Sequence, residues 1–336
     1  MNAPAELVFI GGTGRSGTTV LSHLLGRHSH FFAVPVECRF HCNPKGLADL
    51  AGGRTTTDEF LAKLRTYWWY RIRIGHRALV PVGILGRVRV AGNLLGGRLR
   101  PRGVQPRVRG LHEIVARDRF EKAAAKFEEG CDRDLLRASR ELFYDLLRPL
   151  ADEAGKPALV EMSSFTIAAA AELSRIFPEA RFVHSVRDGR DSGVSKVLLR
   201  EKAHHPTDAA SGIDFWADRL RQAEEGVRGL AAGKRERLHL VGLDELVWGD
   251  REGAYADLLD FLGVSDEEPM REFFDREMTA GAAHQGRWRE GLGPAEQREV
   301  TARYEATLDR LEREGYHCAA LLRRSYEREL ASQPGR

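Results

Sequence analysis

The sequence predicts an α/β fold in which helices flank a central parallel sheet on both faces. Two observations support this prediction: short apolar runs alternate with amphipathic helical segments, and the first run ends in a glycine-rich turn. Strands that are joined through helices run parallel, and the helices cover both faces of the sheet, which gives a three-layer sandwich. We expect one domain over residues 1–331, with a basic, mostly helical insertion at about 45–130 and a short tail at 332–336.

Four strands are predicted from short apolar runs, at residues 7–11, 158–161, 181–186 and 237–241. The polar segment 187–191 is expected to be a turn that follows the third of these strands. The segments with a helical period of apolar residues are 17–27, 58–78, 133–154, 166–177, 192–203, 213–232, 253–263, 268–278, 295–314 and 316–331.

The composition is that of an ordinary globular protein. The chain has 336 residues, with 52 Lys and Arg against 49 Asp and Glu, so its formal net charge is +3. This near balance argues against a nucleic-acid partner. No apolar run reaches the ~20 residues of a membrane span. Neither a signal peptide nor a disulfide framework is evident, so we expect a cytoplasmic enzyme.

One stretch departs from the charge balance. Residues 60–112 carry a formal charge of +12, contain no Asp or Glu, and include the aromatic run Tyr67–Tyr70. Arginines interleaved with Trp and Tyr suit an anionic surface. A binding module for a membrane surface, with peripheral attachment to the membrane, or for nucleic acid through this stretch is therefore one alternative function. The other interpretation is that these arginines are solvated helix faces.

Residues 12–19 read Gly-Thr-Gly-Arg-Ser-Gly-Thr-Thr and join the first predicted strand to the first helix. Gly12 and Gly17 have the spacing of the Walker pattern, whose backbone N–H groups and helix N-terminus bind phosphate. Thr18 stands where the Walker lysine is expected, and no Walker B acid is evident, which disfavours ATP or GTP hydrolysis. A P-loop kinase or NTPase remains the alternative enzyme.

Arg15 supplies a positive charge within this loop, which therefore suits a shorter anion and requires no metal ion. The residues expected to contact the anion are Gly14, Arg15, Ser16, Gly17, Thr18 and Thr19. A metal site built from His28, Cys38, His41 and Cys42 is disfavoured, because the spacing of the cysteines is loose and no second pair follows.

The loop resembles the 5′-phosphosulfate loop of sulfotransferases that use 3′-phosphoadenosine 5′-phosphosulfate (PAPS). Arg187 and Ser195 have the spacing of the 3′-phosphate motif of that family, in which an arginine binds the phosphate bidentately and a hydroxyl donates from the next helix. Residues 243–246 and 260–264 are similar to a family segment with a structural role. The resemblance implies a sandwich of the P-loop NTPase type.

Residues 285–290, Gln-Gly-Arg-Trp-Arg-Glu, resemble the C-terminal Gly-Arg-Trp loop of bacterial and tyrosylprotein-type members. The resemblance implies that Gly286, Arg287 and Trp288 close over the nucleotide, with Arg287 reaching the 3′-phosphate. For Trp288 an anchoring role in the core is the alternative.

The resemblance implies transfer of a sulfonate group from PAPS to an acceptor hydroxyl, or to an amine, by in-line displacement. Arg15 would act on the leaving group, and Glu37 is at a place similar to the catalytic Glu of tyrosylprotein-type members, so it is the expected base. The alternatives are that Glu37 pairs with Arg39 or faces solvent. His41 and His28 are the competing bases.

The sequence departs from the family at one position. Many members carry a lysine in a Glu-Lys-Thr/Ser-Pro segment, where it assists the leaving group, but here residues 161–164 read Glu-Met-Ser-Ser. Met162 occupies the lysine position. Either Ser163 and Arg15 suffice for this role, or the acceptor chemistry differs.

The acceptor is expected where the insertion meets the cleft between Arg15 and Glu37. Tyr67–Tyr70 and the apolar stretch 79–97 favour a small-molecule or lipid-like acceptor. Carbohydrate and protein tyrosine remain alternatives.

Overall fold

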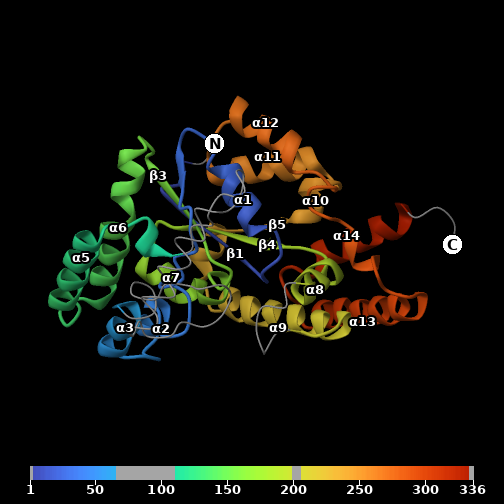
Figure 1. The fold of residues 1–336 in the computed structure, drawn as a ribbon, viewed down its shortest axis with the longest axis horizontal. Helices are drawn as coiled ribbons and strands as arrows, with labels where there is room; N and C mark the ends of the chain where they lie inside the picture. Colours follow the sequence, from blue (N-terminus) through green and yellow to red (C-terminus); the bar gives the residue numbers. More distant parts are fainter. Residues whose placement is uncertain (1–2, 66–109, 199–205, 333–336) are drawn as a thin grey trace, which may run out of the picture.

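A five-stranded parallel sheet forms the centre of the computed structural model, which describes residues 3–65, 110–198 and 206–332 (Figure 1). The strand order is β2-β3-β1-β4-β5, and each neighbouring pair is parallel. The strands are β1 Leu7–Gly12, β2 Phe31–Ala33, β3 Ala158–Met162, β4 Arg181–Val186 and β5 Leu238–Gly242. The predicted α/β class with a central parallel sheet is confirmed.

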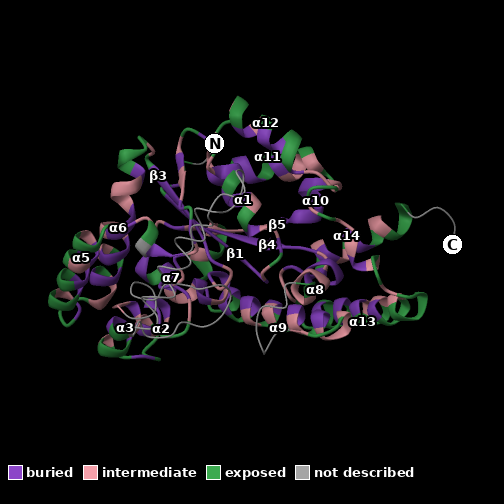
Figure 2. Cartoon of the chain, in the orientation of Figure 1, coloured by how far each residue is buried: buried purple, intermediate pink, exposed green. Residues whose placement is uncertain are grey.

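Side chains of β1 alternate between the two faces of the sheet, as the pleat of a strand requires. Val8 and Ile10 belong to one core cluster, while Leu7 and Phe9 belong to another. The sheet is buried on both sides (Figure 2). This explains why its strands read as continuous apolar runs in the sequence.

Helices form a layer on each face of the sheet (Figure 1). The layer that packs on Val8 and Ile10 contains α1 Thr18–Leu25, α10 Leu243–Val247, α11 Arg251–Leu262 and α12 Glu268–Glu277. The opposite layer contains α6 Leu135–Glu153, α7 Ala170–Ile176 and α9 Ala209–Arg228. A third cluster joins the start of α9 to α13 Pro294–Arg313 and α14 Ala319–Ser332.

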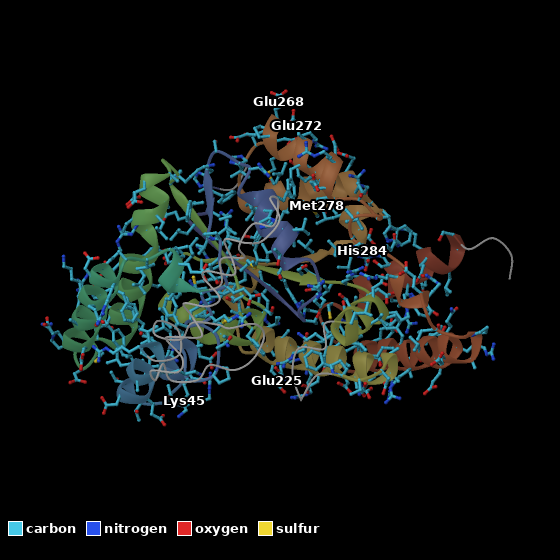
Figure 3. The ribbon with its side chains drawn as sticks, in the orientation of Figure 1. Lys45, Glu225, Glu268, Glu272, Met278 and His284 are labelled. Atoms are coloured by element: carbon cyan, nitrogen blue, oxygen red, sulfur yellow. The ribbon has the colours of Figure 1, made fainter. Side chains whose placement is uncertain are left out.

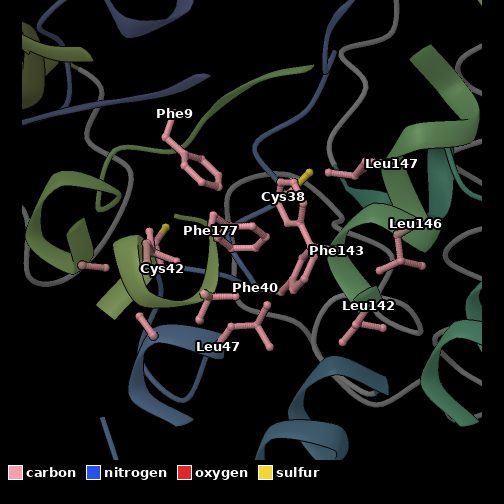
Figure 4. Close-up of a cluster of buried hydrophobic side chains, with 14 of the residues drawn as sticks. Phe9, Cys38, Phe40, Cys42, Leu47, Leu142, Phe143, Leu146, Leu147 and Phe177 are labelled. Carbon is pink, nitrogen blue, oxygen red and sulfur yellow. The ribbon is translucent and has the colours of Figure 1, made fainter. Parts of the chain in front are cut away.

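An aromatic cluster fixes the segment that follows β2 (Figure 4). The ring of Phe143 on α6 lies 5.5 Å from that of Phe9 and 4.9 Å from that of Phe177. Phe40 and Leu47 extend the same cluster. Edge-to-face aromatic packing of this kind is worth ~0.5–1.5 kcal/mol per pair beyond area burial. The chain between β2 and α2 Leu47–Ala51 is thus tied to the core.

The described part of the predicted insertion is helical and packs into the same core as the sheet. It contains α2, α3 Thr57–Lys63 and α5 Arg117–Gly130, which bury Leu47, Phe60 and Phe127. Most of the basic stretch 60–112 lies outside the described residues, as do Tyr67–Tyr70 and the apolar stretch 79–97.

Several boundaries differ from the sequence predictions. The helix α8 Gly189–Leu198 begins inside the predicted turn 187–191. The carboxylate of Asp188 accepts the backbone N–H of Arg190 at 2.7 Å, and this contact stabilises the early start. The strand β2 and the helix α10 were not predicted, because they span only three and five residues. The helices α2 and α5 lie within the insertion that was predicted to be mostly helical, for which no bounds of these two helices were predicted.

Gly212 on α9 and Gly193 on α8 let the two helices approach closely. A Cβ atom on Gly212 would lie 2.8 Å from the carbonyl carbon of Gly193. We expect Gly212→Ala to lower the free energy of unfolding by ~1–3 kcal/mol, because overpacking outweighs the gain in helix propensity, at most ~1 kcal/mol. Denaturant unfolding measures the change. Gly233→Ala is the control, since among the described residues, its own chain neighbours aside, none has an atom within 4 Å of its Cβ position. Equal effects of the two substitutions would contradict the prediction.

Candidate functional site

The glycine loop that follows β1 lies where the strand order reverses, between the carboxyl ends of β3 and β4. In open α/β sheets ligands bind at such a point. Gly14 and Gly17 have φ values of 75° and 91°, and Arg15 also adopts a left-handed conformation, with φ of 63°. A Cβ atom on Gly12 would lie 2.3 Å from the carbonyl oxygen of Ser185. The loop is therefore folded tightly against β4, which only glycine permits.

Buried hydroxyl and backbone groups line the inner side of this loop. The Oγ atom of Ser16 is buried and has no hydrogen-bond partner among the described residues. The helix α1 begins directly after Gly17, so the positive end of its dipole points to the loop. The N-terminus of a helix that follows a glycine-rich loop is suited to receive an anion.

A cavity of about 210 Å³, here called the central cavity, opens beside the loop. Its wall is built from the loop and α1, from α8, from α10, and from the segment between α12 and α13, which includes Met278 and His284 (Figure 3). The residues predicted for the site that line this cavity are Arg15, Gly17, Thr18, Thr19, Arg187, Ser195 and Arg287. Segments far apart in the sequence therefore converge on one space.

Arg15 links the loop to α8. Its Nε atom donates a hydrogen bond to Oγ of Ser195 at 2.9 Å, across 180 residues of sequence. The side chain of Arg15 also lines the central cavity.

Arg187 follows β4 and is almost wholly buried. Its Nη2 atom donates to the carbonyl oxygens of Ala283 at 2.6 Å and His284 at 3.2 Å. Its Nε atom is buried and has no hydrogen-bond partner among the described residues. Asp191 is a counter-charge to this arginine, with Oδ2 at 3.3 Å from Nη2, and the Nε donor is left for a further acceptor.

The predicted closing loop is only partly exposed to the central cavity. Arg287 lines the cavity, whereas Gly286 and Trp288 do not. In the glycine loop, Gly14 and Ser16 likewise do not line it. The Trp288 ring is 3% exposed and packs on the guanidinium of Arg190, 4.6 Å away. This packing corresponds to the alternative of a core anchor.

Glu37 lies just beyond β2 and pairs with Arg39, which is the alternative that the sequence had left open. The residue does not line the central cavity. The backbone on its C-terminal side is held by β3, because the N–H of Cys38 donates to Glu161 Oε1 at 2.9 Å and that of Arg39 donates to Ser163 Oγ at 3.2 Å.

Neither competing histidine base reaches the central cavity. His41 is fully buried, with Nε2 at 3.0 Å from Oε2 of Glu161. Burial lowers the pKa of His41, but the neighbouring Cys42 and Glu161 raise it, to about 10. His28 is 4% exposed, and its Nε2 lies 3.0 Å from the carbonyl oxygen of Ser265. Both side chains are therefore structural in this arrangement.

Met162, at the position of the family lysine, lies beside the loop. Its sulfur is 3.9 Å from Oγ1 of Thr19. The side chain is 8% exposed, so an apolar group occupies this side of the loop.

A group of carboxylates near Arg187 was not predicted to act at the site. Asp191 lines the central cavity, and Asp244 accepts the backbone N–H of Asp188 at 2.8 Å. Asp191 lies one helical turn after Arg187, and this spacing was the available sequence signal. Burial, and then the negative charge of Asp188, raise the pKa of Asp244 to about 7, against the opposing effect of Arg187.

In residues 3–65, 110–198 and 206–332, no three His, Cys, Asp or Glu side chains gather as metal ligands would. No helix in this part of the chain is both long and apolar enough to cross a membrane.

A family model described as "Sulfotransferase family" matches residues 89–268, which is more than half of the chain. The match begins after the glycine loop, so the resemblance of the loop rests on its own residues. None of the curated proteins is detectably similar in sequence to this chain.

Several solved structures are similar to the chain. One is the sulfotransferase domain of the olefin synthase of Synechococcus PCC 7002, with 17% identity, a TM-score of 0.45, and coverage of 91% of this chain and 95% of that one. Another is the sulfotransferase domain from the curacin biosynthetic pathway, with 16% identity, a TM-score of 0.46, and coverage of 91% and 99%. Sulfotransferase STF9 from Mycobacterium avium has 14% identity, a TM-score of 0.41, and coverage of 92% and 77%.

The raised pKa of Asp244 predicts a pH-dependent stability. Its ordinary value is 3.8, so the folded protein holds this proton more tightly than the unfolded chain, and stability falls as the pH rises from about 4 to about 7. Asparagine at this position cannot ionise. We therefore expect the melting temperature of Asp244→Asn, taken relative to that of the parent protein, to be higher at pH 8 than at pH 5.

Thermal melts at the two pH values measure this difference. The surface variant Asp214→Asn is the matched control. An Asp244→Asn difference that is the same at both pH values would contradict the prediction.

Proposed function

The chain belongs to the sulfotransferase family, and from this premise we propose that it transfers a sulfonate group from PAPS to an acceptor hydroxyl. In this reaction the bond between sulfur and the bridging oxygen of the donor breaks, and a bond from the acceptor oxygen to sulfur forms. The acceptor proton passes to a base, and adenosine 3′,5′-bisphosphate leaves. The observation that carries the proposal is the convergence of Arg15, Arg187, Ser195 and Arg287 on the central cavity.

The residues present suit a donor with two separate anionic groups. The loop residues Gly14, Arg15, Ser16, Gly17, Thr18 and Thr19 would hold the 5′-phosphosulfate. A buried donor supports the fit, because Arg187 lines the cavity and its Nε atom has no hydrogen-bond partner among the described residues. Arg187, Ser195 and Arg287 would hold the 3′-phosphate, and each charge-assisted hydrogen bond contributes about 1.5–3 kcal/mol.

Gly286 and Trp288 would contribute indirectly to donor binding. Gly286 has φ of 74° and begins the short turn Arg287–Arg289, and the buried ring of Trp288 anchors that turn. Arg287 lies between them and so is held at the cavity wall.

Arg15 and the N-terminus of α1 would stabilise the leaving group. Negative charge grows on the bridging oxygen as the sulfonate leaves, and fixed positive groups at that point lower the barrier. This role requires no metal ion. Arg15 provides a positive charge on the loop, while Met162 stands at the position where many family members carry a lysine.

Glu37 is the proposed base that accepts the acceptor proton. It lies beyond β2, on a segment that Glu161 and Ser163 hold against the end of β3. Arg39 competes with the acceptor hydroxyl for the carboxylate of Glu37, so the Glu37–Arg39 pair must open when the acceptor binds.

The proposed acceptor is a small molecule or lipid-like compound with a hydroxyl group, and carbohydrate and protein tyrosine are the alternatives. A cytoplasmic location remains a prediction. A membrane-surface role for residues 60–112 also remains a prediction, because most of that stretch lies outside the described residues.

Calorimetric titration with PAPS tests the proposed donor. We expect the protein to bind PAPS, and Arg187→Gln to weaken binding by about ten- to a hundredfold, the equivalent of one lost charge-assisted hydrogen bond. Arg303→Gln, at a surface ion pair with Asp214, is the matched control. A folded protein that does not bind PAPS at high micromolar concentration would overturn the proposed function.

A screen of acceptor classes with sulfur-labelled PAPS identifies the substrate and tests the base. With the acceptor found, Glu37→Gln should lose turnover, because the amide cannot accept the proton, and should keep its affinity for PAPS. Glu59→Gln, at the exposed pair with Lys45, controls for loss of a surface carboxylate. Turnover that is unchanged in Glu37→Gln would eliminate Glu37 as the base.

A further inference from the structure

Asp191 uses both of its carboxylate oxygens on one segment of the chain. Oδ2 accepts the backbone N–H of Gly286 at 2.8 Å, and Oδ1 accepts that of Trp288 at 3.0 Å. The side chain is buried in the first turn of α8, at the wall of the central cavity. The two hydrogen bonds attach residues 286–288 to the helix that begins after Arg187.

Arg187 holds the same segment, but it contacts the carbonyl groups of the segment. While Asp191 accepts from N–H groups, Arg187 Nη2 donates to the carbonyl oxygens of Ala283 and His284. The two side chains also pair with each other, with 3.3 Å between Nη2 and Oδ2. Residues 283–288 are thus held by an ion pair, and Asp191 helps to determine which donors of Arg187 remain for a ligand.

The backbone of this segment needs such support. His284 has φ of 53° and Gly286 has φ of 74°, and residues 283–286 belong to no helix or strand before the short turn Arg287–Arg289 begins. A left-handed conformation is unfavourable for a residue other than glycine. The hydrogen bonds of Asp191 and Arg187 offset this cost and so fix the positions of His284 and Arg287 at the cavity wall.

A carboxylate in the wall of an anion cavity calls for an explanation, because its charge repels the ligand. Burial, and then the negative charge of Asp188, raise the pKa of Asp191, against the opposing effects of Arg187 and of the N–H groups of Gly286 and Trp288. The groups that favour the ionised carboxylate, Arg187 and these two N–H groups, are the same groups that it contacts and positions.

We propose that Asp191 is a positioning residue for recognition of the 3′-phosphate: it orients Arg187 and holds residues 283–288, so that the protein prefers nucleotides with a 3′-phosphate. The inference rests on the proposed function, since it takes the occupant of the central cavity to be a 3′,5′-substituted adenosine nucleotide. Asp191 does not touch the nucleotide in this role and acts through Arg187 and Arg287.

The test compares adenosine 3′,5′-bisphosphate with AMP, which lacks the 3′-phosphate, by calorimetry. Asp191→Asn removes the charge opposite Arg187 and one of the two acceptors. We expect its dissociation constant for the bisphosphate to rise about tenfold and that for AMP to change less than about twofold. Asp218→Asn, on the exposed face of α9, is the matched control and should leave both constants unchanged.

The outcomes separate the two proposals. A parent protein that binds neither nucleotide would overturn the proposed function and this inference with it. A parent protein that prefers the bisphosphate, together with an Asp191→Asn variant that keeps the same preference, would overturn the inference alone. Tighter binding of the bisphosphate by the variant would also overturn it, because repulsion would then be the main effect of Asp191. A general loss of structure in Asp191→Asn would weaken the binding of both nucleotides equally.

Hydrogen exchange of the parent protein provides a second measurement, in case Asp191→Asn does not fold. The bisphosphate should slow exchange of the amides in residues 283–288 more than AMP does at equal saturation, since only the 3′-phosphate engages Arg187. Equal protection by the two nucleotides would overturn the inference.

Discussion

The position of β1 between β3 and β4 is the constraint on which the site depends. Parallel strands present their carboxyl ends at one edge of the sheet, so the loop after β1, the Ser163–Ser164 turn after β3 and Arg187 after β4 meet there. The register pairs Gly12 with Ser185, and the Ser185 hydroxyl donates to the carbonyl oxygen of Ser16. The anion loop is therefore fixed to the strand that delivers Arg187.

Charge pairing in the first turn of α8 extends this arrangement to the C-terminal part of the chain. Arg190 is 1% exposed and is enclosed by the rings of Trp288, Tyr304 and Tyr326, with Asp188 and Glu329 as its counter-charges. Breaking a buried pair by removing one partner leaves an uncompensated charge, at a cost of about 3–5 kcal/mol. Helices α13 and α14 thus support the wall of the central cavity from behind.

The sequence predicted the sheet and the loop because their signals are local. Four of five strands and the strand-loop-helix unit at Gly12–Gly17 are readable from short runs, whereas β2 is too short to show a pattern. Asp191 was missed because its partner Gly286 lies 95 residues further on. The pairing of Glu37 with Arg39, two residues away, could be stated from the sequence only as an alternative, since the spacing does not decide between pairing and catalysis.

Residues from the glycine loop and from the start of α8 are proposed to bind the two ends of one nucleotide. A crystal structure with adenosine 3′,5′-bisphosphate is the decisive measurement. We expect the 5′-phosphate in the loop at residues 14–19 and the 3′-phosphate within hydrogen-bond distance of Arg187 and Ser195. A nucleotide bound elsewhere, or one whose 3′-phosphate faces away from Arg187, would contradict it.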